Sequence, residues 1–131
     1  MRRAFLDKAE ECLRGADREF GDGRYNNCAN RCYFACFQAA VYALLLAGDI
    51  PTNDRAMLGH DFVQARFVGH LINRRKVYPA SLRDVLARNL VHRHIADYSV
   101  NGVTGTQAAR APARTRLFLD AIRAVGGDGK W

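Results

Sequence analysis

The sequence predicts an all-α fold, an antiparallel up-and-down helical bundle of four long helices plus one shorter helix, in one domain over residues 1–131. Two features of the pattern favour this class. Apolar residues recur at intervals of three and four along most of the chain, which is the spacing of a buried stripe on a helix, and strand-like alternation is nearly absent. A third observation is the length, because 131 residues suit a single domain with its own core.

The first two helices are predicted over residues 4–20 and 25–46. In the first, Phe5, Ala9, Leu13 and Phe20 lie on one stripe, and the glycine-containing turn 21–23 ends it. The second has no helix breaker before Gly48, and its apolar residues cover more than one face. This is typical of a central helix with neighbours on several sides.

The remaining helices are expected after the polar loop 52–59, beginning with a short amphipathic helix over residues 62–72. The next runs from about residue 79 to residue 98, with Ser81 as its N-cap and with Leu82, Val85, Leu86, Asn89, Leu90 and Arg93 facing inward. The last is predicted over residues 112–125, with Pro112 in its first turn and Leu117 facing inward.

The chain is basic, with 20 Lys and Arg against 13 Asp and Glu, a formal net charge of +7. This charge favours an anionic partner, with a polyphosphate such as RNA or a nucleotide first; the alternative is a merely basic protein. The start of the chain does not resemble a signal peptide, and the longest apolar run, residues 39–48, is about half a membrane span. We therefore expect a cytoplasmic protein with no membrane partner.

Three cysteines, Cys28, Cys32 and Cys36, are spaced four residues apart on one helical face. We expect small core residues here; the alternative is metal or redox chemistry. The sequence also contains no glycine-rich phosphate loop, no serine elbow and no His-Glu metalloprotease motif. It thus predicts no metal site and no cofactor.

Polar side chains that can take part in catalysis concentrate in residues 88–98, near the end of the fourth predicted helix. One turn separates Arg88 from His92, and likewise Arg93 from Asp97. Such groups suit metal-independent RNA cleavage, in which His or Tyr moves protons and Arg stabilises the phosphate. The alternative is that Arg93 and Asp97 form an ordinary ion pair and that Tyr98 only secures the helix end.

Three motifs resemble prokaryotic HEPN-domain proteins: Arg93-x-x-Ala96-Asp97-Tyr98, Asn30-Arg31-x-Tyr33-Phe34-Ala35-x-Phe37 and Ala9-Glu10-x-Cys12-Leu13. Members of this family usually carry Asn-Arg-x-Tyr-Tyr-Ala-x-Phe and Arg-x-x-Ala-Asp-Tyr, and many have His and Phe where His60 and Phe67 stand. The resemblance implies a helical bundle that forms a homodimer. It also implies a gene often encoded beside a minimal nucleotidyltransferase, and in many members an RNA-cleaving toxin of a toxin-antitoxin or defence system.

The family's nuclease signature, an Arg followed four to six residues later by His or, in one branch, by Tyr, fits this chain in two registers. Arg93 precedes Tyr98 by four intervening residues, and Arg88, followed by Asn89, precedes His94 by five. We rank the Arg93 register first because the long match in the second helix indicates the Ala-Asp-Tyr branch. The predicted catalytic residues are thus Arg93, Tyr98, Asp97, His94 and Arg88.

Four further residues are predicted on the substrate side: Asn30, Arg31, Tyr33 and Asn89. Asn30 interrupts an apolar helix, so its side chain either hydrogen-bonds to the fourth helix and orients the arginine there or is simply exposed. Tyr33 suits either the core or a phenol that reaches the site. The sequence-based function is a dimeric HEPN ribonuclease in which the two helix-four ends meet; the alternative is a non-catalytic HEPN module that binds nucleotide or partners a nucleotidyltransferase.

Overall fold

A computed structural model describes residues 2–50 and 59–127 of the chain. These residues form α1 (Arg3–Gly21), α2 (Tyr25–Ala47), α3 (His60–Arg66), the π-helix η2 (Phe67–Arg74), the short 3-10 helix η3 (Ala80–Leu82), α4 (Val85–Tyr98) and α5 (Gly105–Gly127). No strand occurs among them, so the predicted all-α class is confirmed. Pro51 and most of the predicted loop, residues 52–58, lie outside the described residues.

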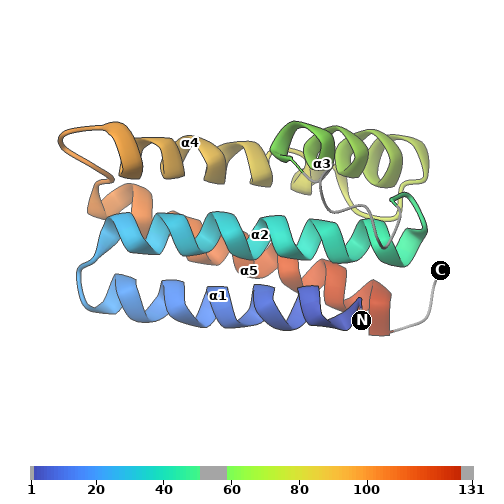
Figure 1. Cartoon of the computed structure of the whole chain (residues 1–131), viewed down its shortest axis with the longest axis horizontal. Helices are drawn as coiled ribbons and strands as arrows, with labels where there is room; N and C mark the ends of the chain where they lie inside the picture. The colour runs from blue at the N-terminus through green and yellow to red at the C-terminus, as the bar shows by residue number, and fades with distance from the viewer. Residues whose placement is uncertain (1, 51–58, 128–131) are drawn as a thin grey trace.

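The long helices α1, α2, α4 and α5 run alternately in opposite directions, α3 runs parallel to α2, and α2 lies at the centre (Figure 1). Helix α1 packs along one side of α2, α5 crosses behind it, and α3 and α4 lie end to end on the remaining side. The shorter helix therefore shares one position of the bundle with α4. This arrangement places the α4 segment that carries the predicted site against α2 and, to a lesser extent, against α5.

The central position of α2 follows from its composition, as predicted. Small residues such as Ala35, Ala39 and Ala43 are fully buried, which lets neighbouring helices approach closely on several sides. Gly48 ends the helix in the left-handed conformation, at a φ of 76°, and the Asp49 N–H donates to the Leu44 carbonyl.

The predicted helix over residues 62–72 exists, but it begins at His60 and widens into a π-helix from Phe67 onward. Phe67, Leu71 and Ile72 are all buried, and their spacing of four and five residues suits the wider turn better than a regular α-helix. The Phe67 ring packs against Tyr78 and Phe118, with centroids 5.3 and 5.1 Å away. This aromatic group fixes the end of the bundle away from the predicted site.

Two predicted helix starts are wrong. Residues 80–82 form a separate 3-10 turn in which Ser81 makes no capping bond, and α4 begins only at Val85. Helix α5 begins seven residues before Pro112, because Thr104 and Gln107 form a capping box. The Gln107 N–H donates to Thr104 Oγ1 at 3.1 Å, and the Thr104 N–H donates to Gln107 Oε1 at 3.0 Å. Pro112 lies buried inside the helix.

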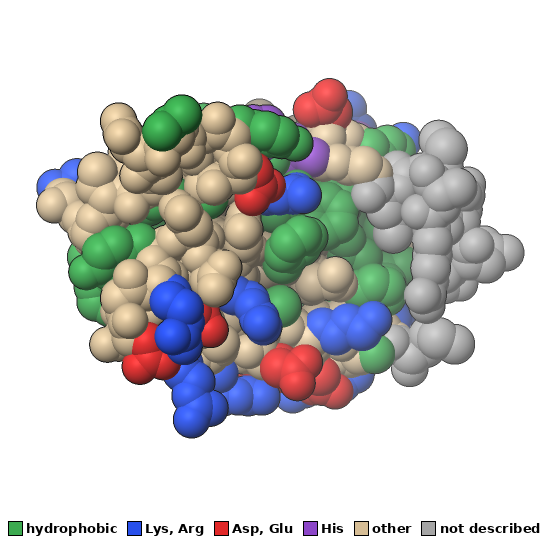
Figure 2. Space-filling view, turned by 60° about the vertical axis from the view of Figure 1, so that its left-hand side comes forward, with side chains coloured by type: hydrophobic (Ala, Val, Ile, Leu, Met, Phe, Trp, Pro, Cys, Tyr) green, Lys and Arg blue, Asp and Glu red, His purple; other side chains and the backbone are tan. Residues whose placement is uncertain are grey.

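One predicted inward residue of α5 faces outward. Leu117 is 67% exposed, since the buried stripe passes through Thr115, Phe118 and Ile122 and leaves position 117 outside it. Charged side chains of both signs gather along the lower edge of Figure 2, at the level of α1. The interface of α1 with α5 carries ion pairs such as Arg116–Asp17 and Arg123–Glu10.

Cys28, Cys32 and Cys36 are fully buried free thiols, which confirms that they are core residues. Burial raises the pKa of the Cys36 thiol to about 12, although hydrogen bonds with Thr115 and Asn89 act in the opposite direction. In the described part of the chain, no three His, Cys, Asp or Glu side chains group as metal ligands would. Nor does any helix within residues 2–50 and 59–127 have the length and hydropathy needed to cross a bilayer.

Candidate functional site

Arg93 lies in a hollow of about 740 Å³ bounded by α2, α3 and α4, which we call the Arg93 hollow. Helix α2 contributes aromatic side chains to it, the start of α3 contributes His60 and Asp61, and α4 contributes Arg93 and His94. The lining residues are Tyr33, Phe34, Phe37, Gly59, His60, Asp61, Phe62, Leu90, Arg93 and His94. The hollow thus combines an apolar wall with one guanidinium and two imidazoles.

The Arg93 guanidinium is held by stacking and by an ion pair. Its central carbon lies 5.0 Å from the centroid of the Tyr33 ring and 4.9 Å from that of Phe34, which is cation–π geometry with both rings. Its Nε lies 3.6 Å from Asp97 Oδ2, one turn along α4. Stacking fixes the plane of the guanidinium without using its N–H groups, so those that do not face Asp97 can bind an incoming phosphate.

His60 and Tyr33 form a second polar pair in the Arg93 hollow, with Tyr33 Oη and His60 Nδ1 3.2 Å apart. Burial lowers the pKa of His60, and the nearby His94 acts in the same direction while Asp61 opposes them. Burial also raises the pKa of Tyr33 despite the charge of Arg93. At neutral pH the hollow therefore holds a neutral imidazole suited to accept a proton.

The structure brings together only part of the predicted catalytic set. Arg93 and His94 line the Arg93 hollow, and Asp97 is linked to it only through its ion pair with Arg93. Tyr98 is 82% exposed and is linked to the hollow only through a ring contact with His94, at 6.0 Å between centroids. Arg88 lines a different hollow, on the far side of α4. Within one chain, then, Arg88 and His94 do not meet.

The possible hydrogen bond from Asn30 to the fourth helix is not formed. Asn30 Oδ1 is buried without a hydrogen-bond partner among the described residues. Arg31 points away from the site and lies over α1, where its Nη1 comes within 3.1 Å of the position that a Cβ on Gly15 would occupy. The hydrogen bonds that join α4 to its neighbours come instead from a side chain on α4, that of Asn89.

Asn89 is fully buried and joins α4 to both α2 and α5. Its Nδ2 donates to Thr115 Oγ1 at 3.0 Å and to Cys36 Sγ at 2.9 Å. Its Oδ1 accepts from Arg114, at 3.1 Å from Nε and 2.7 Å from Nη2. Asn89 therefore positions an arginine, the role suggested for Asn30, but the arginine is on α5.

Sequence reasoning missed two groups at these sites. His60 was named only for its place in the family resemblance and not as a site residue, since nothing in the sequence shows that the start of α3 folds against α2 and α4. Arg110 and Arg114 stand one turn apart, but the predicted helix began at Pro112 and hid that spacing. The Thr104-x-x-Gln107 capping signature could have revealed it.

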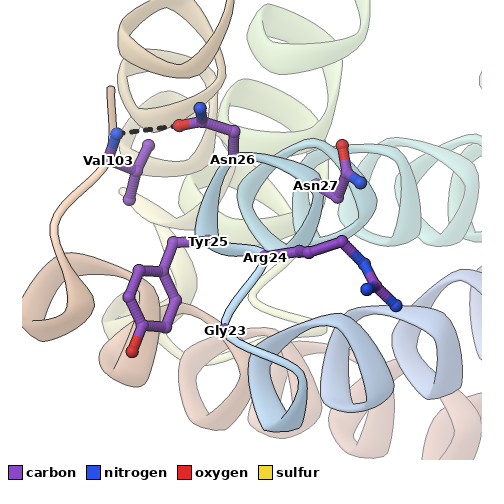
Figure 3. A pocket seen from close by; sticks show the side chains of 6 residues that line it. All are labelled: Gly23, Arg24, Tyr25, Asn26, Asn27 and Val103. Atoms are coloured by element: carbon purple, nitrogen blue, oxygen red, sulfur yellow. Dashed lines mark hydrogen bonds between the residues drawn. The ribbon is translucent and has the colours of Figure 1, made fainter. Parts of the chain in front are cut away.

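Another hollow, lined by residues 23–27 and Val103, lies at the turn between α1 and α2 (Figure 3). There Asn26 Oδ1 accepts a hydrogen bond from the Val103 N–H at 2.9 Å. Arg24 pairs with Glu19 and Asp22. The polar side chains of this hollow therefore have a structural role: they stabilise the α1–α2 turn and the loop before α5.

Comparison with known families supports the resemblance drawn from the motifs. A family model described as HEPN domain matches residues 3–125. The chain belongs to the HEPN-domain family. The match spans every described helix except the last two residues of α5, so the HEPN domain is the whole bundle and includes both hollows beside α4. No curated protein sequence matches the chain significantly.

Proposed function

We propose that this HEPN domain is a metal-independent endoribonuclease of the toxin or defence type, with the Arg93 hollow as its active site. One observation carries the proposal: the Arg93 guanidinium, backed by two aromatic rings, opens into the same hollow as His60 and His94. A phosphate-binding group beside two imidazoles is the minimum set for cleaving RNA through its own 2′-hydroxyl.

The proposed reaction is an internal transesterification. His60, neutral because of its lowered pKa, takes the proton from the 2′-hydroxyl, whose oxygen then attacks the adjacent phosphorus. Arg93 stabilises the negative charge on the pentacoordinate phosphorane. His94 gives a proton to the departing 5′-oxygen, and the products are a 2′,3′-cyclic phosphate and a 5′-hydroxyl end.

The apolar wall of the Arg93 hollow provides the RNA contacts beyond the phosphate. Phe34 is 39% exposed at the hollow, so one face of its ring offers a stacking surface for an unpaired base. We therefore propose a single-stranded or looped target.

The functional unit we propose is a two-fold homodimer in which the α4 ends of two chains approach each other. Large apolar side chains are exposed where α4 ends: Tyr98 is 82% exposed, and Val100 is fully exposed in the loop that follows. Covering them with a second copy would remove apolar surface from water and bring the two Arg93 hollows closer. A nucleotidyltransferase antitoxin is the further partner we propose.

A second candidate is a non-catalytic module that binds nucleotide or a nucleotidyltransferase. Two observations favour this candidate. The ion pair with Asp97 neutralises part of the positive charge with which Arg93 would bind a phosphate, and Tyr98 lies outside the hollow. In this reading Arg93 is structural.

An RNA-cleavage assay in excess chelator separates the two candidates. We expect cleavage with cyclic phosphate ends, and loss of most of it in Arg93→Lys, because Lys keeps the charge but lacks the planar bidentate contact. Arg116→Lys is the matched control, since that exposed residue pairs with Asp17 at the α1–α5 interface. His60→Ala and His94→Ala test the two proton-transfer roles.

Two further variants test the alternative registers. Loss of cleavage in Tyr98→Phe with folding retained would add the phenol to the site, whereas loss only in Arg88→Ala would move the site to the other side of α4. If all these variants cleave as the unmodified protein does, or if the protein cleaves no RNA, the ribonuclease proposal fails and the binding module replaces it.

A further inference from the structure

A second hollow, of about 240 Å³, lies between α4 and α5 on the side of α4 opposite the Arg93 hollow, and we call it the α4–α5 hollow. Each helix contributes two basic side chains one turn apart: Arg88 and His92 from α4, Arg110 and Arg114 from α5. Figure 1 shows α5 passing behind α2, with α4 on the opposite side of α2 from α1. Four nitrogen-rich groups on two packed helices thus surround one small space.

The positive charge of the α4–α5 hollow is not balanced by any ion pair within residues 2–50 and 59–127. In the described part of the chain, no carboxylate lies within ion-pair distance of Arg88, Arg110 or Arg114, whereas Arg116 and Arg123 on the same helix α5 are both paired. Asp84 shares an adjoining hollow of about 170 Å³ with Arg88 and Arg114 but forms no ion pair with either. Three guanidinium groups therefore repel one another there, an arrangement that an anion would stabilise.

One of the three guanidinium groups is also fixed in place. Arg114 is half-buried, and it donates from Nε and Nη2 to the oxygen of the buried Asn89. The same Nη2 lies 3.3 Å from His92 Nδ1. Because its acceptor is a neutral amide rather than a carboxylate, Arg114 is held rigidly and keeps its full charge.

We propose that the α4–α5 hollow binds the terminal phosphate group of a phosphate monoester. A monoester phosphate carries close to two negative charges at neutral pH, which suits three arginines better than the single charge of a diester. The volume is smaller than that of typical small-molecule pockets, so the hollow admits the phosphate while the rest of the ligand stays outside. The ligand is either a free 5′-nucleotide or the 5′-phosphorylated end of an RNA.

The test is a titration of the purified full chain by calorimetry with 5′-AMP, inorganic phosphate and adenosine. We expect binding of 5′-AMP and of phosphate but not of adenosine. Arg110→Ala should weaken both by about tenfold or more, the effect of removing one charge-assisted contact. The matched control is Arg116→Ala, on the same helix but paired with Asp17, and it should bind as the unmodified chain does.

Arg93→Ala keeps this test separate from the proposed ribonuclease. It should leave the affinity for 5′-AMP unchanged, since Arg93 lies in the other hollow, and a loss there would assign the phosphate to the Arg93 hollow and overturn the proposal. So would equal binding of 5′-AMP and adenosine, or equal affinities of Arg110→Ala and Arg116→Ala. Circular dichroism of each variant checks that the helices are intact.

Whether the bound phosphate belongs to an RNA end or to a free nucleotide is decided by comparing two affinities. One is that of a short RNA with a 5′-phosphate, and the other is that of the same RNA with a 5′-hydroxyl. Tighter binding of the phosphorylated RNA than of 5′-AMP, lost in Arg110→Ala, assigns the hollow to an RNA end. Binding of 5′-AMP with no difference between the two RNAs assigns it to a free nucleotide. Both results support a monoester phosphate site.

Discussion

Replacing Asn89 by Ala should lower the free energy of unfolding by about 4 kcal/mol. The two shorter neutral bonds from Nδ2, to Thr115 and Cys36, are each worth about 1 kcal/mol, beside a longer one of 3.4 Å to the Cys32 carbonyl. The charge-assisted acceptance from Arg114 is worth about 1.5–3 kcal/mol. The site is fully buried, so water cannot replace the lost partners without opening the core. Urea denaturation followed by circular dichroism measures the change.

A double-mutant cycle isolates the contact with Arg114. In an Arg114→Met background, Asn89→Ala should cost about 1.5–3 kcal/mol less than in the unmodified chain, because the guanidinium that loses its acceptor is already gone. Asn101→Ala, in an exposed loop, is the matched control and should change stability by less than about 0.5 kcal/mol. A cost below about 1 kcal/mol for Asn89→Ala, or a coupling energy near zero, would refute the role assigned to this network.

Three further predictions concern the core, the pH dependence and the assembly. Replacing Cys28, Cys32 and Cys36 together by Ala should cost about 1 kcal/mol per site through small cavities and leave RNA cleavage intact, as urea denaturation and the cleavage assay would show; stoichiometric bound zinc or iron would contradict this. Burial lowers the pKa of both His60 and His92 in the folded state. The unfolded chain thus takes up protons first as the pH falls below about 6.5, so stability should decline there, and the double replacement by Gln should flatten that decline in denaturation curves. Light scattering should give a dimer, and a mass near 14.7 kDa at micromolar concentrations would contradict the proposed assembly.

The helices could be predicted from the sequence because their burial is periodic. The bounds of α1 and α2 were predicted within one or two residues, since Gly48 and the glycines around position 22 end helices by backbone conformation alone. The start of α5 was placed wrongly because Pro112 was read as a boundary, although the capping pair Thr104 and Gln107 lies upstream. A proline can lie inside a helix when packing supports the turns around it.

The candidate site could be predicted only where its residues are neighbours on α4. The spacing of Arg93 and Asp97, and of Arg88 and His92, indicated their shared faces correctly. His60 with Tyr33, and Asn89 with Arg114, depend on which helices pack together, and one chain's sequence does not reveal such pairings. Arg88 and His94 also lie on opposite sides of α4, because six residues along a helix do not return to the same face, and a linear motif does not show this.

The π-helix η2 implies that this stretch of the chain carries one residue more than a regular helix needs. Its wide turns end with the Arg75 N–H bonded to the His70 carbonyl at 2.9 Å, five residues back. Deleting a single residue there would let the backbone return to four-residue spacing while both ends keep their places. Gly69 is the position to delete, since apart from its chain neighbours and the nearby backbone of its own helix nothing lies within 4 Å of where its Cβ would stand. The bundle should therefore accept a shorter chain at this point, where elsewhere in its helices a deletion would rotate every following side chain out of register.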